Sequence, residues 1–265
     1  MDQYEEATTA DKVKVSVKVM THTQIPPLRA TIALDDILKQ VHSANLDTVI
    51  EILNRKNIVV WPININDVKL YVLKDFEARY KDLIWASQLG YTNVIALFFN
   101  INYSIKLFRE RDLYRIVAGF LVHDAYEGVL KLTLPDIESE VKIHDHELGV
   151  VGVADLVSNN YVIEIKLGKG SKRHELQLAA YMKALKKYKG YLVYPDNVVE
   201  IEYTNSLVQK LVKAVAYLKR LRNIVLNHDL RYIASKFTHS YIKFKQIYGV
   251  EPEKLVKVLE KEGFI

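Results

Sequence analysis

Residues 149–167 read GVVGVADLVSNNYVIEIKL, and this stretch decides the fold. Its two apolar runs predict two strands of a buried sheet. Side chains alternate between the two faces of a strand, so Asp155 ends an otherwise apolar face of the first strand. Glu164 and Lys166 share one face of the second strand. Both predicted strands therefore carry charge where apolar side chains are expected.

Charged side chains in buried strands need partners, because burying an unpaired charge is costly. We therefore expect the charges of the two strands to meet each other and a metal ion. Two carboxylates offer hard oxygen ligands for Mg²⁺ or Mn²⁺, and such a metal stabilises the charge on a phosphodiester. Lys166, on the same side as Glu164, can orient the attacking water or stabilise the developing charge. The pattern predicts a phosphodiesterase site on Asp155, Glu164 and Lys166.

A second Glu-x-Lys triplet, Glu140–Val141–Lys142, lies on the strand predicted just before. Only the triplet at 164–166 is preceded at a suitable distance by Gly152-x-x-Asp155. We therefore expect the 140–142 triplet to be a solvated strand face.

The predicted helix over 108–131 brings further polar residues to one face. At about 100° per residue, His123 and Glu127 continue the apolar face that includes Phe120. Histidine is a common metal ligand. The two residues also fit a satisfied core histidine and a carboxylate that pairs with a nearby base. Gly119 costs this helix about 1 kcal/mol relative to alanine, and close packing of its backbone would explain it.

The predicted helix over 171–188 places Gln177 and Tyr181 one turn apart on one face. There they can hold the lysine, a water or a phosphate, or form the edge of an amphipathic helix. The loop before it, GKGSKRHE, combines two glycines with a helix N-terminus, which is typical of a phosphate contact. A solvated basic loop is an equally good interpretation of its three cations, Lys169, Lys172 and Arg173.

The order of predicted elements over 108–203 is helix, three strands, helix, two strands, which favours a mixed sheet between helices. Before this region, residues 31–75 predict two short helices and a hairpin, an arrangement that resembles a winged-helix module. After it, 205–227 predict a long amphipathic helix and 230–265 further helices.

Four motifs occur in order: Gly119-x-x-x-His123-x-x-x-Glu127, Gly152-Val-Ala-Asp155, Glu164-Ile-Lys166 and Gln177-Leu-Ala-Ala-Tyr181. This ordered set resembles the RecB-like branch of the PD-(D/E)XK nuclease superfamily. The resemblance implies an α/β fold, namely a restriction-endonuclease-like core with a mixed central β-sheet flanked by helices. We expect an N-terminal α+β region over 1–105, the nuclease core over 106–230 and a C-terminal helical segment over 231–265.

The resemblance also implies roles for the site residues. His123, Asp155 and Glu164, with the carbonyl of Ile165, would ligate Mg²⁺ or Mn²⁺. Lys166 would assist the nucleophilic water, and Gln177 and Tyr181 would support the site and the DNA. Glu127 is a supporting residue, and the cations Lys169, Lys172 and Arg173 are expected DNA contacts.

The chain contains no cysteine, which excludes disulfides, thiolate zinc sites and cysteine-ligated iron–sulfur clusters. The sequence resembles the CRISPR-associated exonucleases and the nuclease domains of helicase–nucleases. Many of these proteins carry a four-cysteine iron–sulfur cluster that ties the N-terminal region to the C-terminal segment. Here that segment would be held by packing, through the aromatic residues Tyr232, Phe237, Tyr241, Phe244 and Tyr248.

The composition sets the expected partners and location. With 37 Lys and Arg against 32 Asp and Glu, the net charge is +5, which suits a polyanionic partner. No apolar run approaches the roughly 18 residues of a membrane helix. The polar, acidic N-terminus does not resemble a secretory signal. We therefore expect a cytoplasmic protein that binds DNA and no membrane.

The sequence thus predicts a metal-dependent DNase, an exonuclease that acts on single-stranded DNA or DNA ends. The pathway stays open among repair, recombination, mobile-element replication and CRISPR adaptation. Two alternatives stay open. One is a structure-specific endonuclease of the same superfamily. The other is a non-catalytic DNA-binding or regulatory protein on a nuclease scaffold, because a fold alone does not fix a function; the 31–75 segment and the basic charge motivate it.

Overall fold

The structure is a computed structural model that describes residues 4–8, 14–19, 30–32, 34–74, 83–90, 93–134, 136–167, 170–195 and 197–265. The chain forms two compact units, and each unit combines three stretches that lie far apart in the sequence. The first unit consists of Met1–Asn45, Leu83–Gly90 and Arg115–Val215. The second consists of Leu46–Asp82, Tyr91–Tyr114 and Ala216–Ile265.

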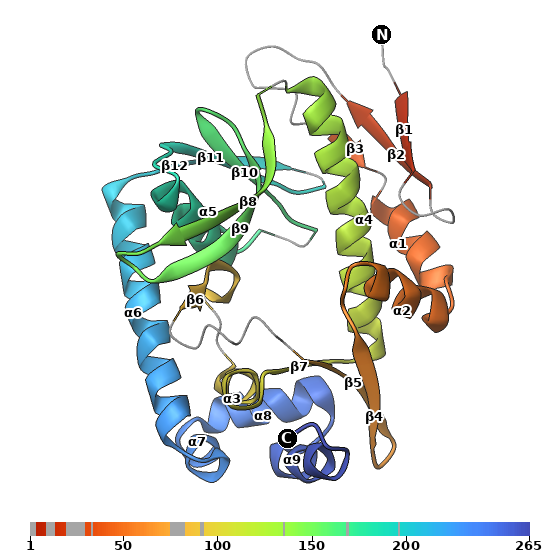
Figure 1. The fold of residues 1–265 in the computed structure, drawn as a ribbon, viewed down its shortest axis with the longest axis vertical. Coiled ribbons are helices and arrows are strands. Elements are labelled where there is room, and N and C mark those ends of the chain that lie inside the picture. The colour runs from red at the N-terminus through yellow and green to blue at the C-terminus, as the bar shows by residue number, and fades with distance from the viewer. Residues whose placement is uncertain are drawn as a thin grey trace. The chain divides into compact units, whose positions relative to one another are not determined.

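A six-stranded sheet forms the centre of the first unit (Figure 1). Its strands, in spatial order, are β12 (Val198–Glu202), β11 (Lys189–Val193), β10 (Tyr161–Ile165), β9 (Val150–Val157) and β6 (Ile84–Trp85), with β8 (Glu138–Asp145) also paired to β9. The pairs β10–β11 and β6–β9 are parallel and the others antiparallel, so the sheet is mixed. The α/β class with a mixed, helix-flanked sheet is confirmed, and it is consistent with the expected nuclease-like core.

Strand β9 has three partners, and this produces a gap in the sheet. Strand β8 pairs with β9 from Val150 to Val157, with a break in the register at Asp155. Both other partners therefore lie on the opposite edge, where β6 pairs with residues 150–151 and β10 with residues 156–157. Between them, the edge of β9 at residues 152–155 has no strand partner among the described residues. The predicted site residue Asp155 lies in this gap.

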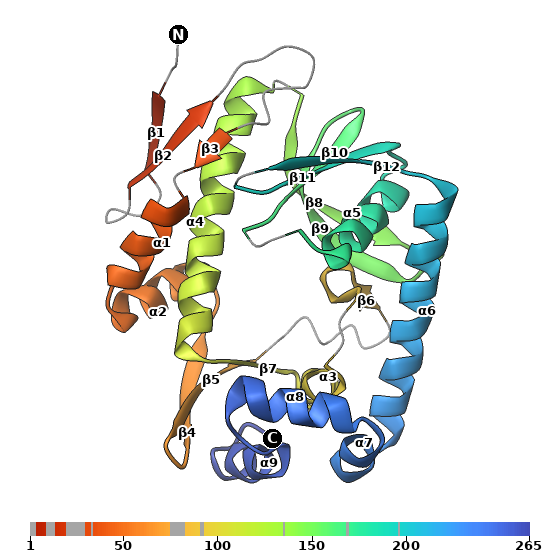
Figure 2. The same ribbon diagram turned by 180° about the vertical axis from the view of Figure 1, so that it is seen from behind.

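The helices of the first unit flank this sheet or precede it. Helix α5 (Lys172–Ala184) packs against β8, β9, β10 and β11, and it also contacts the 3-10 turn η2 (Ala86–Gln88), as Figure 2 shows from behind. The N-terminal stretch adds the sheet β1 (Tyr4–Thr8), β2 (Lys14–Val19) and β3 (Ala30–Ile32), followed by α1 (Leu34–Ser43). Helices α4 (Glu110–Thr133) and α6 (Asn205–Asn227) each have residues in both units.

Helix α3 (Val94–Tyr103) is the core of the second unit, because most of its residues are buried on all sides. Phe99 of α3 stacks on Phe244 of α8, with ring centroids 5.6 Å apart. The other elements are α2 (Leu46–Arg55), β4 (Val60–Ile65), β5 (Val68–Lys74), β7 (Ile105–Phe108), α7 (Leu230–Lys236), α8 (Thr238–Tyr248) and α9 (Pro252–Lys261).

The elements predicted from periodicity are present within a few residues of their expected bounds. Residues 31–75 contain the expected two helices and hairpin, and β7 joins that hairpin as a third strand. The winged-helix resemblance and the predicted domain bounds remain predictions. In the C-terminal segment Phe244 is fully buried and Tyr248 packs on its ring at 4.7 Å, whereas Tyr232 is exposed. Among the described helices, none combines the length and apolarity needed to cross a membrane.

Lys183 on α5 ties that helix to the end of β8. Its Nζ lies 2.8 Å from Oδ2 of the buried Asp145 and 2.7 Å from Oε2 of the exposed Glu147. Burial alone would raise the pKa of Asp145, but the bond from Lys183 keeps it below the ordinary value. The two ion pairs differ in burial, so they are expected to differ in their contribution to stability.

We expect Lys183→Met to lower the free energy of unfolding by roughly 2–4 kcal/mol at pH 7, because it leaves a buried carboxylate without its cation. Glu147→Gln removes only the exposed pair and should cost less than about 1 kcal/mol. The folded-state pKa of Asp145 is depressed, so this stabilisation is present above pH 3.8 and is lost as the pH falls through the folded-state value. Denaturant unfolding at pH 7 and pH 3 measures both effects, and equal losses in the two variants would contradict them.

Candidate active site

The Asp155 side chain crosses the gap between β9 and β10. Its Oδ2 accepts a hydrogen bond from the backbone N–H of Ile165 at 2.7 Å. On the other edge of β10, Lys166 donates its N–H to Val193 of β11, so Ile165 faces the gap. The N–H and C=O of one strand residue point to the same edge. The Ile165 carbonyl therefore also faces the gap, where it was expected to serve as a metal ligand.

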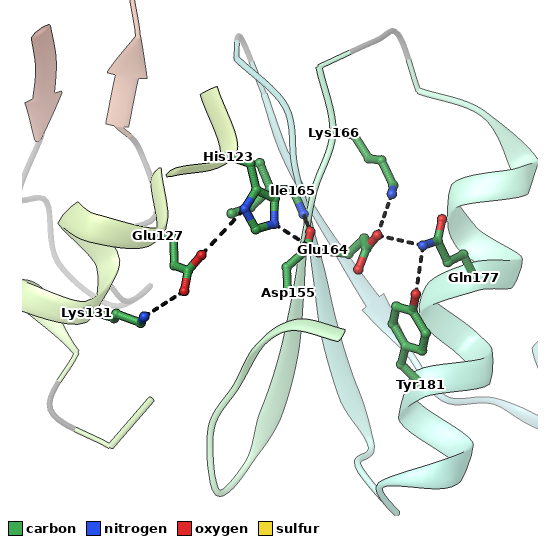
Figure 3. Close-up of polar contacts among 9 residues, drawn as sticks. All are labelled: His123, Glu127, Lys131, Asp155, Glu164, Ile165, Lys166, Gln177 and Tyr181. Carbon is green, nitrogen blue, oxygen red and sulfur yellow. Dashed lines mark hydrogen bonds and ion pairs between the residues drawn. The ribbon is translucent and has the colours of Figure 1, made fainter. Parts of the chain in front are cut away.

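Glu164 is the most buried charged residue of the site, with 1% of its surface exposed. Figure 3 shows its carboxylate pointing toward Lys166 and Gln177. Lys166 Nζ donates a hydrogen bond to Glu164 Oε1. Gln177 Nε2 donates to the same oxygen at 2.8 Å and to the hydroxyl of Tyr181 at 2.8 Å. The two strands and α5 thus form one hydrogen-bonded group.

The second oxygen of Glu164, Oε2, is buried and has no hydrogen-bond partner among the described residues. Burial, together with the nearby Asp155 carboxylate, raises the pKa of Glu164 to about 8, although Lys166 acts in the opposite direction. Burial also raises the pKa of Tyr181, so that hydroxyl stays protonated at neutral pH. Glu164 is therefore a carboxylate whose charge the protein compensates only in part.

His123 links helix α4 to the same gap. Its Nε2 lies 3.0 Å from Asp155 Oδ1, and its Nδ1 lies 3.5 Å from Glu127 Oε2. Glu127 is in turn paired with Lys131 at 2.6 Å. Burial lowers the pKa of His123, but its bond to Asp155 and the surrounding carboxylates raise it above 6.5 overall. His123 is half-buried at the edge of the helix core and so differs from a fully buried core histidine.

The structure thus brings His123, Glu127, Asp155, Glu164, Ile165, Lys166, Gln177 and Tyr181 together (Figure 3). The expected DNA contacts are less defined. Lys172 and Arg173 are exposed on the first turn of α5, and Arg173 Nη2 donates to the Ser87 carbonyl at 3.3 Å. Lys169 lies outside the described residues. Their role in binding DNA remains a prediction.

Two predictions about neighbouring residues can be judged from the structure. Glu140 and Lys142 of the other triplet are exposed on β8, which confirms the solvated strand face. The expected close packing of Gly119 is wrong, because a Cβ built at Gly119 meets nothing within 4 Å in the described structure. A tightly packed glycine of the site motifs is instead Gly152, where a Cβ would lie 2.8 Å from Cε1 of Tyr181.

The sequence analysis also missed His174 and Tyr194. His174 lies on the first turn of α5, and its Nδ1 is 3.0 Å from the hydroxyl of Tyr194. Burial and the positive charges of Lys166 and Arg173 lower the pKa of His174 to about 4. His174 is therefore neutral at physiological pH although it lies close to the site lysine. The histidine stands inside the basic loop that had been noted for its cations, so its position was the available signal.

The site can be tested for its fit to a divalent metal. Within the described ranges, no group of three or more His, Asp and Glu side chains is arranged to hold a metal ion as it stands. In this arrangement His123 is bonded to Asp155 and Lys166 to Glu164. Two other features fit a cation. The carboxylates of Asp155 and Glu164 and the carbonyl of Ile165 are oxygen ligands of the kind that Mg²⁺ and Mn²⁺ prefer. Glu164 Oε2 is a buried carboxyl oxygen that lacks a partner among the described residues, and such an atom is costly to leave unpaired.

Comparison with known proteins gives only distant similarities. The sequence matches no known protein-family model. Among solved structures, the alkaline exonuclease of Laribacter hongkongensis is similar at 17% identity and a TM-score of 0.38, over 61% of this chain and 97% of that one. The protein SSO0001 is similar at 22% identity and a TM-score of 0.38, over 51% of this chain and 76% of that one.

Gly152→Ala should disturb the site through Tyr181. The new Cβ would lie 2.8 Å from Cε1 and 3.2 Å from the hydroxyl oxygen of this buried ring, so the ring has to move and its bond with Gln177 weakens. Overpacking of this kind costs typically about 1–3 kcal/mol. Thermal unfolding measures the loss. Gly119→Ala is the control, since its Cβ meets open space and alanine favours the helix by up to about 1 kcal/mol; equal Tm changes in the two variants would refute the role of Gly152.

Glu164→Gln should stabilise the metal-free protein at alkaline pH. The folded state holds the Glu164 proton more tightly than the unfolded state, whose pKa is near 4.5, so stability falls as the pH rises from 4.5 through about 8. Removing the charge should raise the Tm at pH 9 by a few degrees or more, and the gain should shrink toward pH 5. Thermal unfolding in chelator over this pH range tests it. A gain that does not depend on pH would exclude titration of Glu164 as the cause.

Proposed function

We propose that this protein is a metal-dependent deoxyribonuclease of the PD-(D/E)XK superfamily, in its RecB-like branch. The Glu164 carboxylate is the observation that carries the proposal. It lies at 1% exposure in a central strand, its Oε1 is held by Lys166 and Gln177, and its Oε2 has no partner in the described structure. A purely structural position would be filled by an apolar side chain at lower cost. A carboxylate with one oxygen left over is suited to a cation.

His123, Asp155 and Glu164, with the Ile165 carbonyl, would hold Mg²⁺ or Mn²⁺. When bound, this metal lowers the pKa of a water and stabilises negative charge on the phosphate. In the structure, Asp155 spans the gap between β9 and β10, so it joins the His123 side of the site to the Ile165 side. The ligands come from a helix and two strands, which are more rigid supports than loops.

Lys166 is the residue suited to the phosphate and the attacking water. Its Nζ contacts the buried Glu164, while 20% of its side chain remains exposed, so its charge reaches from the sheet interior to the surface. A fixed cation at this place stabilises the charge that develops on the phosphate. Gln177 and Tyr181 act as positioning residues, because Gln177 donates to Glu164 Oε1 from α5 and is itself bonded to the Tyr181 hydroxyl.

We further propose that the substrate is DNA and that cleavage proceeds as an exonuclease, from single-stranded DNA or duplex ends. The net charge of +5 and the exposed cations Lys172 and Arg173, at the N-terminus of α5, support a phosphate backbone as the ligand. A structure-specific endonuclease would use the same residues, and circular DNA distinguishes it from an exonuclease.

The test is cleavage of end-labelled single-stranded, linear duplex and circular DNA with Mn²⁺ or Mg²⁺ and with chelator. Wild type should cut the linear substrates only when the metal is present, and Lys166→Ala should lower the rate by about 10²-fold or more. Lys142→Ala, in the exposed triplet on β8, is the matched control and should cleave like wild type. Equal behaviour of wild type and Lys166→Ala on every substrate would end the nuclease proposal.

A further inference from the structure

The excess of cationic over acidic side chains in this chain comes from one segment. Residues 205–250 contain nine Lys and Arg but a single acidic residue, Asp229. The whole chain has 37 cationic and 32 acidic side chains, which leaves 28 against 31 outside this segment. The segment therefore supplies more than the entire net charge of +5, and the remainder of the chain is slightly acidic.

In the second unit this segment forms the end of α6 together with α7 and α8, which pack on the buried helix α3 (Figure 1). Asn102 of α3 donates to the Val225 carbonyl of α6 at 3.3 Å. On α8, Phe244 stacks on Phe99, and Ser240 accepts from the N–H of Val94 at 3.3 Å. The inner sides of α7 and α8 are thus occupied by α3. The charged residues of these helices lie on the outer sides, except Arg222 of α6, which is buried.

Five cations on the outer sides are exposed and form no ion pair within the described part of the chain: Lys219, Arg220, Arg231, Lys236 and Lys243. We call them the basic helix surface. The one acid of the segment, Asp229, is engaged as the N-cap of α7, where it accepts from the N–H of Tyr232 at 2.8 Å. Unpaired cations that repel one another are unfavourable unless an anionic partner neutralises them.

Exposed aromatic rings lie among these cations in the same helices. Tyr217 is 55% exposed on α6, between Lys213 and Arg220. Tyr232 is 39% exposed on α7, next to Arg231, and its ring stacks on that of His228 at 3.9 Å. Cations that follow a backbone and aromatic rings on which bases stack are the combination found in proteins that bind single strands.

We propose that the basic helix surface binds single-stranded DNA, with its cations on the phosphates and with Tyr217 and Tyr232 stacked on bases. The choice of DNA rests on the proposed nuclease function. The surface lies in the second unit and the candidate active site in the first. Binding and cleavage can therefore be lost separately, and each can be measured without the other.

The experiment measures binding of a fluorescent single-stranded oligonucleotide by full-length protein carrying Lys166→Ala, which removes cleavage from the readout. Arg220→Gln, Lys236→Gln and Lys243→Gln are combined in one variant. Each lost phosphate contact should weaken binding about 4-fold at 0.15 M salt, so roughly 50-fold in all, and the salt dependence of log K should fall by about 2. Adding Tyr217→Ala and Tyr232→Ala should weaken single-strand binding by at least about 5-fold more, with duplex binding less affected.

The matched control combines Lys254→Gln, Lys257→Gln and Lys261→Gln on α9. It removes the same charge from exposed positions of the same unit, but α9 also carries Glu253 and Glu260. It should bind within about 3-fold of the parent. Equal weakening in both triple variants would show that only net charge matters and would overturn the proposal. Thermal unfolding of each variant confirms that the unit remains folded.

Two further outcomes separate this proposal from others. If anionic phospholipid vesicles bind the parent as tightly as the oligonucleotide does, and the same triple variant abolishes that binding, the surface binds membranes and the proposal fails. If the wild-type protein cleaves no DNA while the triple variant still loses the oligonucleotide, the nuclease function fails and the basic helix surface stands. If the wild-type protein cleaves DNA but the triple variant binds the oligonucleotide as tightly as its parent, the proposed role of the basic helix surface fails and the nuclease function stands.

Discussion

The charge of Glu164 in the middle of a sheet is the constraint on which the site depends. A carboxylate at 1% exposure loses its hydration, and among the described residues two donors, from Lys166 and Gln177, replace it. Lysine and glutamine arrive from different elements, so α5 has to lie close against β10. The close fit of Tyr181 over Gly152 follows from the same requirement. The hydrogen bonding of this carboxylate therefore depends on the packing of α5 against the sheet.

The gap between β9 and β10 is the second feature on which the site depends. A regular ladder between β9 and β10 would satisfy the N–H of Ile165 with a backbone carbonyl. Here the two strands pair only at residues 156–157 of β9, and the Asp155 carboxylate accepts that N–H. A functional side chain thereby replaces a backbone partner, which keeps the sheet edge satisfied and exposes polar atoms to the site. Irregular pairing next to functional residues is common for this reason.

The sequence was sufficient for the parts of this arrangement that depend on local periodicity. The strands around Asp155 and Glu164 follow from alternation, and the wheel of α4 places His123 and Glu127 on one side. The sequence was not sufficient to predict which strands pair with one another. Strand β6 is only two residues long and joins β9 from 66 residues away, so no local pattern identifies it. The fit of Gly152 against Tyr181 and the contact of His174 with Tyr194 depend on the same long-range pairing. The close packing expected at Gly119 was wrong, since a helical glycine costs stability whether or not anything packs on it.

Both units are discontinuous in the chain, and this has a consequence for how the protein can be made and cut. The first unit needs residues up to Val215 and the second needs residues up to Ile265, while both also use residues before Gly90. Neither unit can complete its fold during synthesis until most of the polypeptide has left the ribosome. Until then, the apolar surfaces of the segments before Gly90 remain exposed. Deletion of residues 1–75 would remove α1 from the first unit, and α2, β4 and β5 from the second. The N-terminal segments are integral parts of two folds, and separating them by deletion would damage both.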